Sequence, residues 1–192
     1  MKKTLLLFTL LLVSVITTAC INKFAVEELN NKAVKYMDNG DSETAVCRLK
    51  SSLDLDEEFY QTHYNLALAY NALGNFEGAA EEAARVLELE PDFHDAVYVL
   101  ALAKSELAMQ ILDKEQDEEG KTAELTIDEM SEFNNKAGEA VELYNKYLVK
   151  KVNAEDAEQV NAKIEELNSY IKEFSYKLES AQGASKEEAA EE

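Results

Sequence analysis

The apolar and polar positions of this chain recur as a block. Six residues each have a counterpart of the same type 34 positions later: Tyr36, Gly40, Ala45, Leu53, Leu55 and Phe59 correspond to Tyr70, Gly74, Ala79, Leu87, Leu89 and Phe93. A period of this length is typical of helical hairpins that stack, because one hairpin alone cannot bury its apolar face. The pattern predicts an all-α helical-hairpin solenoid with repeats over 26–59 and 60–93.

A third repeat is expected over 94–151, with an insertion near 113–125. Its first helix repeats the earlier pattern, because Tyr98, Leu100, Ala101 and Leu102 follow Tyr64, Leu66, Ala67 and Leu68 by one period. The register then fails in a polar, acidic stretch. Thr126 and Glu129 have the spacing of a capping box, which predicts a new helix. The apolar stripe of that helix comprises Ile127, Met130, Phe133, Ala137, Val141, Tyr144 and Leu148.

A long amphipathic helix is predicted over 152–179, with Asn153 as its N-cap. Its apolar residues alternate steps of four and three: Val160, Ile164, Leu167, Ile171, Phe174 and Leu178. This spacing fits a cap that packs on the third hairpin, and it also fits the seam of a homodimer. Residues 180–192 are small and acidic without apolar periodicity, so we expect a disordered tail.

The first nineteen residues have the pattern of an export signal. Two lysines precede an apolar run from Leu5 to Ile16, which would span about 18 Å as a helix, short of the roughly 30 Å of a bilayer core. The run ends in Thr17-Thr18-Ala19-Cys20, which resembles the lipobox of bacterial lipoproteins. That resemblance implies cleavage after Ala19, a lipid on Cys20, and a short tether over 20–25. The alternative is an ordinary signal peptide with an unmodified cysteine.

The resemblance to lipoproteins also implies a location. The expected place is the cell envelope, with the protein held by the lipid on Cys20. In lipoproteins of this kind, an aspartate directly after the lipidated cysteine resembles an inner-membrane retention signal. In this chain that position holds Ile21. The periplasmic face of the outer membrane is therefore favoured if the host has two membranes.

The charge balance limits the partners. The chain has 39 acidic and 19 basic residues and a formal net charge of −20. Nucleic-acid binding and electrostatic docking to anionic lipids both need clustered basic residues, so neither is expected. Membrane attachment is accordingly expected to be covalent. The acidic surface is either simply solvated or selects a basic protein partner.

The hairpin units resemble tetratricopeptide repeats. In the unit 60–93 the characteristic positions of that family hold His63, Leu66, Ala67, Tyr70, Ala79, Ala83 and Pro91. The unit 26–59 holds Leu29, Lys32, Ala33, Tyr36, Ala45, Leu49 and Glu57, in which Lys32 and Glu57 depart from the family pattern. The glycines Gly40 and Gly74 are expected to end the first helix of each pair in the left-handed conformation.

This resemblance implies a concave groove, lined by the first helix of each pair, that binds polypeptides. The corresponding residues here are Asn30, Val34, Met37, Tyr64, Asn65, Leu68, Asn71, Tyr98 and Leu102. Some relatives clamp a terminal carboxylate with Lys and Asn, but the matching positions here hold Asn30, Val34, Tyr64 and Leu68, so that mode is not expected. The alternative is that these residues only pack against the neighbouring or terminal helix.

No catalytic constellation or phosphate-binding loop is evident in the sequence. His63 and His94 fall at repeat-defined positions and are interpreted as structural. The stretch around Gly120 only distantly matches a calcium loop, and no metal or other cofactor is expected besides the lipid. Cys47 is interpreted as a partly buried helix residue, the alternative being a disulfide between chains. The predicted function is a non-catalytic scaffold or assembly factor of the envelope, the alternative being a self-associating structural lipoprotein.

Overall fold

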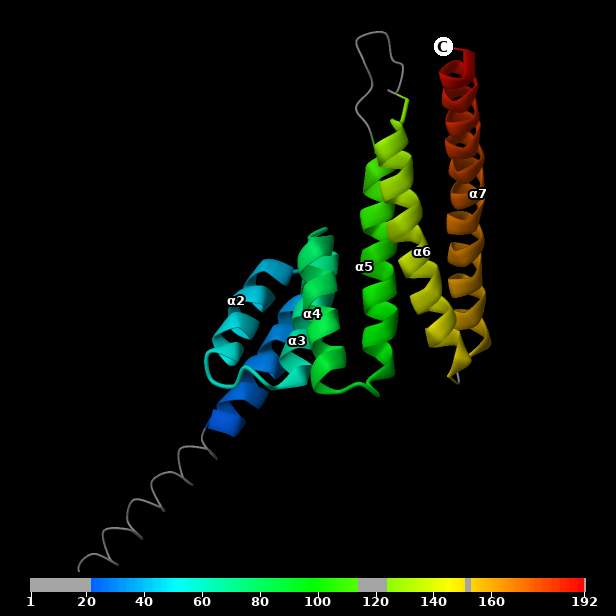
Figure 1. The fold of residues 1–192 in the computed structure, drawn as a ribbon. Helices are drawn as coiled ribbons and strands as arrows, with labels where there is room; N and C mark the ends of the chain where they lie inside the picture. Colours follow the sequence, from blue (N-terminus) through cyan, green and yellow to red (C-terminus); the bar gives the residue numbers. More distant parts are fainter. Residues whose placement is uncertain (1–21, 114–123, 151–152, 192) are drawn as a thin grey trace, which may run out of the picture.

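The computed structural model describes residues 22–113, 124–150 and 153–191. The leader, Cys20 and the acidic segment around Gly120 lie outside these residues. The described chain is helical over 22–38 and then in six labelled helices, shown in Figure 1: α2 (Ser42–Leu53), α3 (Tyr60–Ala72), α4 (Phe76–Leu89), α5 (His94–Leu112), α6 (Ile127–Val149) and α7 (Ala154–Glu191). The predicted all-α solenoid of hairpins with a long last helix is confirmed.

Each helix packs against the next one along the chain, and α3 also touches α5. The first helices of successive pairs therefore lie next to one another on one side of the stack. Alanines at repeat-equivalent positions, Ala33, Ala67, Ala45 and Ala79, are fully buried. Their small side chains let helix backbones approach closely, which is why the repeat needs them there.

The turns inside the first two hairpins have the same construction. Gly40 and Gly74 adopt positive φ angles of 78° and 72°, which glycine reaches without the steric cost of a Cβ atom. The next residue in each turn, Asp41 or Asn75, then caps the second helix by accepting a backbone N–H bond at 3.1 Å. The predicted role of both glycines is confirmed.

The third hairpin has longer helices and a longer connection than the first two. Helix α5 has 19 residues and α6 has 23. The capping box at the start of α6 is present in both directions: the Thr126 hydroxyl accepts from the Glu129 N–H, and the Glu129 carboxylate accepts from the Thr126 N–H. The predicted start of this helix is therefore confirmed.

The apolar stripe of α7 packs within the chain. Val160, Leu167 and Phe174 are buried in one core with Phe133 and Tyr144 of α6. The intervening stripe residues Ile164, Ile171 and Leu178 pack against the same core. Asn153 caps the helix by accepting the Asp156 N–H at 2.9 Å. The cap interpretation thus describes the structure, whereas a homodimer seam on this stripe would require α7 to leave its own core.

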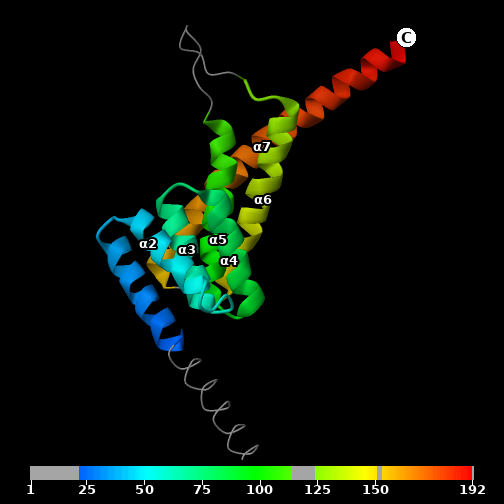
Figure 2. The same ribbon diagram turned by 90° about the vertical axis from the view of Figure 1, so that its left-hand side faces the viewer.

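Two sequence interpretations need correction. Helix α7 continues through Glu191, so the expected disorder from Ser180 onward is wrong for 180–191. Alanine and glutamate dominate that segment and have high helix propensity, so an existing helix can continue there without an apolar stripe. Figure 2 shows the C-terminal end of α7 reaching beyond α5 and α6.

The second correction concerns Cys47, which is exposed on α2 and not partly buried. The buried face of α2 is formed by Ala45, Val46 and Leu49, and Cys47 lies off that face.

None of the described helices has an apolar stretch long enough to traverse a bilayer.

Candidate functional site

The face made by the first helices of the pairs contains a cavity of about 340 Å³ near its N-terminal end. We call it the N-terminal cavity, and it is lined by Glu27, Asn30, Asn31, Val34, Phe59, Gln61 and Asn65. Three of the predicted groove residues, Asn30, Val34 and Asn65, therefore meet at one place. Val34 is 37% exposed and gives the cavity an accessible apolar side chain.

At the other end of this face, residues of α5, α6 and α7 surround two adjoining cavities of about 170 and 240 Å³. Both are lined by Tyr98, Gln159 and Val160, and together they form what we call the tyrosine cleft. Its remaining lining residues are Leu102, Glu106, Tyr144, Tyr147, Asp156 and Lys163. The structure thus brings the predicted residues Tyr98 and Leu102 to a second site, with α7 as its other wall.

The remaining predicted residues lie between or behind these two sites. Tyr64 and Leu68 are partly buried and pack with Tyr98 on the core around Ala67, Ala83 and Val99. Met37 packs on the core shared by the first two repeats. Asn71 is half-buried, and neither polar atom of its amide has a partner within the described residues. The prediction that all nine residues form one continuous groove is too simple.

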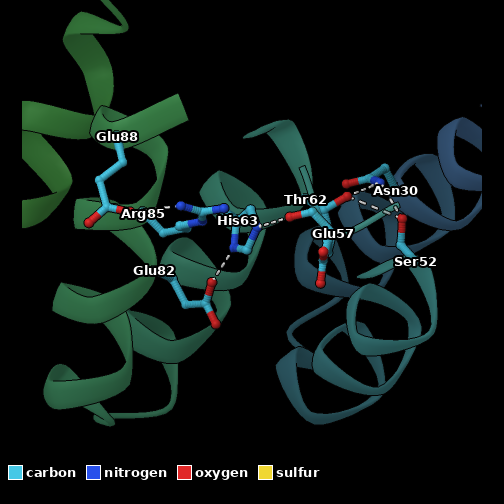
Figure 3. A network of polar contacts seen from close by, with 8 residues as sticks. All are labelled: Asn30, Ser52, Glu57, Thr62, His63, Glu82, Arg85 and Glu88. Atoms are coloured by element: carbon cyan, nitrogen blue, oxygen red, sulfur yellow. Dashed lines mark hydrogen bonds and ion pairs between the residues drawn. The ribbon is translucent and has the colours of Figure 1, made fainter. Parts of the chain in front are cut away.

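Asn30 is the clearest departure from the prediction, because its amide is used inside the protein. The residue is 6% exposed. Its Nδ2 lies within 3.0 Å of the Val26 carbonyl and of the Ser52 and Thr62 hydroxyls. Its Oδ1 accepts from the Asn65 amide at 2.9 Å. Asn30 therefore links the first helix to α2 and α3, as Figure 3 shows for Ser52 and Thr62, and cannot also bind a peptide backbone.

His63 continues this polar layer toward α4. Its Nδ1 lies 2.6 Å from the Glu82 carboxylate, and its Nε2 donates to the Glu57 carbonyl at 2.8 Å (Figure 3). Since both partners are acceptors, the ring is best satisfied when both nitrogens carry protons. The bond to Glu82 accordingly raises the pKa of His63, against the opposing effect of burial.

His94 also has a structural position. Its Nε2 donates to the Tyr147 carbonyl at 2.7 Å, and its ring stacks on the Tyr147 ring with centroids 4.9 Å apart. No group of three or more histidine, cysteine or acidic side chains in the described ranges is arranged to hold a metal ion. The calcium-like stretch around Gly120 lies outside those ranges.

Sequence reasoning missed several lining residues, although the repeat contained a signal for some. Glu27, Gln61 and Asp95 stand one period apart. The first two line the N-terminal cavity, and Asp95 lies near the tyrosine cleft, where its charge acts on Tyr147. Gln159 and Lys163 of α7 had no such signal, since α7 lies outside the repeat. Their place in the site depends on how α7 docks.

No family model matches the chain, and no curated protein matches it. Solved structures do match. The second TPR domain of human RPAP3, solved with the HSP70 peptide SGPTIEEVD, aligns with a TM-score of 0.52 at 12% identity, over 77% of this chain and 98% of that one. The TPR2B domain of yeast Sti1, in a pHsp70 complex, aligns with a TM-score of 0.51 at 17% identity, over 74% and 98%.

The first TPR domain of human RPAP3 aligns similarly, with a TM-score of 0.52, 16% identity, and 79% and 95% of the two chains covered. A Thermobaculum terrenum O-GlcNAc transferase mutant also matches at 16% identity over 64% of this chain, with a TM-score of 0.44, but the match spans only 20% of the transferase chain. The three matches from RPAP3 and Sti1 show that the chain has the fold of a tetratricopeptide-repeat domain.

Proposed function

We propose that this protein is a membrane-anchored, non-catalytic scaffold that binds segments of other proteins in the bacterial cell envelope. The observation that carries the proposal is the face made by the first helices of the pairs, where the N-terminal cavity and the tyrosine cleft lie. Two proteins of the same fold support it, since RPAP3 and Sti1 were each solved with an HSP70-derived partner.

The N-terminal cavity offers groups that suit an extended peptide. Asn31 is exposed, and the Gln61 side-chain oxygen is buried without a partner in the described structure. A buried acceptor of this kind is uncommon and calls for a donor such as the backbone N–H of a bound segment. Val34 adds an apolar contact beside these polar groups. Backbone bonding together with side-chain pockets is a general mode of peptide recognition.

Charge restricts which segments are suitable. The chain carries a net charge of −20, and Glu27 lines the N-terminal cavity. An acidic segment would be repelled here, whereas a basic or neutral one would not. The N-terminal cavity thus favours partners unlike an acidic chaperone tail.

The lipid anchor is the second part of the proposal. In the sequence, one residue, Ile21, separates Cys20 from Asn22, where the first described helix begins. Two residue steps span at most about 7 Å, so acyl chains on Cys20 would hold the first repeat close to the bilayer surface. Phe24, which is 68% exposed, lies at this end of the molecule. Two or more acyl chains give stable anchoring.

The anchor is tested by expressing the full chain in a bacterium fed an alkyne analogue of palmitate. The wild-type chain should take up the label and sediment with membranes. Cys20→Ala should lose the label, and Cys47→Ala, which changes the other cysteine of the chain, should keep it. Labelling that persists in Cys20→Ala would contradict the proposed anchor.

Partner binding is tested by photo-crosslinking in living cells, with a photoreactive amino acid at Val34 or Leu102. A matched control carries it at Glu81, which is exposed on α4, a second helix of its pair. We expect the same protein to be captured at both groove positions and not at Glu81, and to be lost in Leu102→Glu with helicity unchanged. Equal capture at all three positions would contradict the groove assignment.

The structure gives less support to a self-associating lipoprotein. The stripe that could form a homodimer is buried against α6 in the same chain. Sedimentation of the detergent-solubilised chain should therefore show one copy per particle. A tight dimer that is lost on substituting stripe residues such as Leu167 would favour the alternative instead.

A further inference from the structure

We propose that the tyrosine cleft is a subsite for one cationic side chain, lysine or arginine, of the bound segment. The inference rests on the proposed function, because it assigns the chemistry of one end of the same groove. It starts from three tyrosine rings and several carboxylates that surround two small cavities.

The rings of the cleft are held in place. Tyr98 lies next to both Tyr144 and Tyr147, with centroid separations of 6.1 and 5.2 Å and interplanar angles of 58° and 44°. The Tyr144 hydroxyl bonds to the Ser105 hydroxyl at 3.2 Å, and His94 stacks on Tyr147 and bonds to its carbonyl. Fixed aromatic rings that meet at an angle attract a cation through the negative charge density of their faces.

The charges around the rings are mostly negative. Asp156 and Glu106 line the cleft directly. Burial raises the pKa of Tyr147, and the nearby charges of Asp156 and Asp95 raise it further. Burial likewise raises the pKa of Tyr144 to about 12, with smaller contributions from Glu106 and Glu166. The carboxylates therefore act on the space that the rings enclose.

Lys163 is the single basic residue among those lining the two cavities in the described structure. It lies 3.1 Å from Glu166 and 3.7 Å from Glu106, so its charge is balanced within α7 and α5. The Asp156 carboxylate accepts a bond from the neutral Asn153 amide at 2.8 Å, which brings no positive charge to it. The cleft thus retains an uncompensated negative charge beside aromatic faces.

The size of the cavities suits a long side chain. They measure about 170 and 240 Å³ and adjoin each other along Tyr98, Gln159 and Val160. The side chains of Gln159 and Val160 of α7 line both cavities. A long side chain with an apolar stem and a charged end can contact both the valine and the tyrosine rings.

The test uses the full chain in detergent micelles with ¹³C-labelled tyrosine rings, observed by NMR. The probes are N-acetyl-arginine methylamide and its neutral isostere N-acetyl-citrulline methylamide. We expect the arginine probe to shift the Tyr98 and Tyr147 signals and to bind between about two and thirty times more tightly than the citrulline probe. Asp156→Asn should reduce the preference for arginine, and added salt should weaken arginine binding.

Two variants serve as controls. Tyr98→Leu removes one ring and should abolish the arginine-induced shift of Tyr147, whereas Tyr176→Leu removes a tyrosine that is 73% exposed on α7 and should change nothing. If Tyr98→Leu fails to fold, Asp156→Asn still decides the question, because Asp156 is exposed and asparagine can keep the bond from Asn153. Equal affinities for the two probes, or shifts confined to other tyrosines, would overturn the inference.

The outcome is separable from that of the proposed function. Loss of the crosslinked partner in Leu102→Glu, together with no preference for arginine, would keep the groove function and remove the cation subsite. Arginine binding in the cleft without a partner captured at Val34 or Leu102 would support the subsite and contradict the scaffold function.

Discussion

The two ends of this solenoid are joined to their neighbours by different chemistry. At the N-terminal end, the first helix meets α2 and α3 through a small, alanine-rich apolar core and through the buried polar side chains of Asn30, Ser52 and Thr62. At the C-terminal end, α6 meets α7 through aromatic and aliphatic side chains. Phe133 lies edge-on to Phe174 and Tyr170, at centroid distances of 5.1 and 5.7 Å.

The difference matters because polar and apolar contacts contribute unequally to the free energy of unfolding. Exchanging water for internal hydrogen bonds gives a small net stabilisation, although leaving one partner unsatisfied is costly. Burial of an aromatic side chain gives a large one, with a further contribution from ring geometry. We therefore expect the C-terminal core to supply most of the stability, and the N-terminal network to fix the angle at which the first helix docks.

The largest predicted effect is at the C-terminal core. Phe133 is fully buried, so Phe133→Ala should lower the free energy of unfolding by about 3 to 5 kcal/mol, through lost burial and the cavity left behind. Urea unfolding followed by circular dichroism measures this. The control is Tyr176→Ala, an exposed aromatic on the facing helix, which should change stability by less than about 0.5 kcal/mol. Similar losses in the two variants would contradict the assignment of stability to this core.

A smaller effect is predicted at the N-terminal joint. Asn30→Ala removes the bonds to Val26, Ser52, Thr62 and Asn65, but the two hydroxyls remain 3.1 Å apart and can still bond to each other. We expect a loss of about 2 kcal/mol, below that of Phe133→Ala. Hydrogen exchange should show the loss in the first helix and not in α6 or α7, since contacts in a solenoid are between neighbours. Uniform acceleration across all helices would contradict the comparison.

Much of this fold could be predicted from the sequence because its determinants are local. A positive-φ glycine followed by a capping residue ends one helix and starts the next, as at Gly40 and Gly74. The Thr126 capping box acts over only three residues. The stripe of α7 has a regular spacing that requires a partner surface, although the sequence could not say whether that surface belonged to the same chain.

The candidate site was predictable only in part, because burial depends on distant partners. Asn30 occupies the position equivalent to Tyr64 and Tyr98, yet it turns inward toward Ser52 and Thr62, which are 22 and 32 residues away. The repeat pattern does not contain that pairing. In the same way, α7 supplies a wall of the tyrosine cleft from outside the repeats.

The smallest predicted effect concerns His63, which bridges the joint between the second pair of helices. In the folded protein the Glu82 carboxylate raises the pKa of His63 above its ordinary value of 6.5. A raised folded-state pKa stabilises the protein fully below the pKa of the unfolded chain, and this contribution is lost as the pH rises through the folded-state pKa. The wild type should therefore lose stability when the pH is raised from 6 to above the folded-state pKa of His63.

Glu82→Gln tests this contribution, because glutamine keeps an acceptor oxygen but removes the negative charge. We expect the variant to be about 1 kcal/mol less stable than wild type at pH 6, since a charge-assisted bond is replaced by a neutral one. As the pH rises, the two stability curves should converge. Glu81→Gln, at the neighbouring exposed position on α4, should follow the wild-type curve at every pH. A Glu82→Gln deficit that stays constant with pH would show that the carboxylate acts through packing and not through the proton on His63.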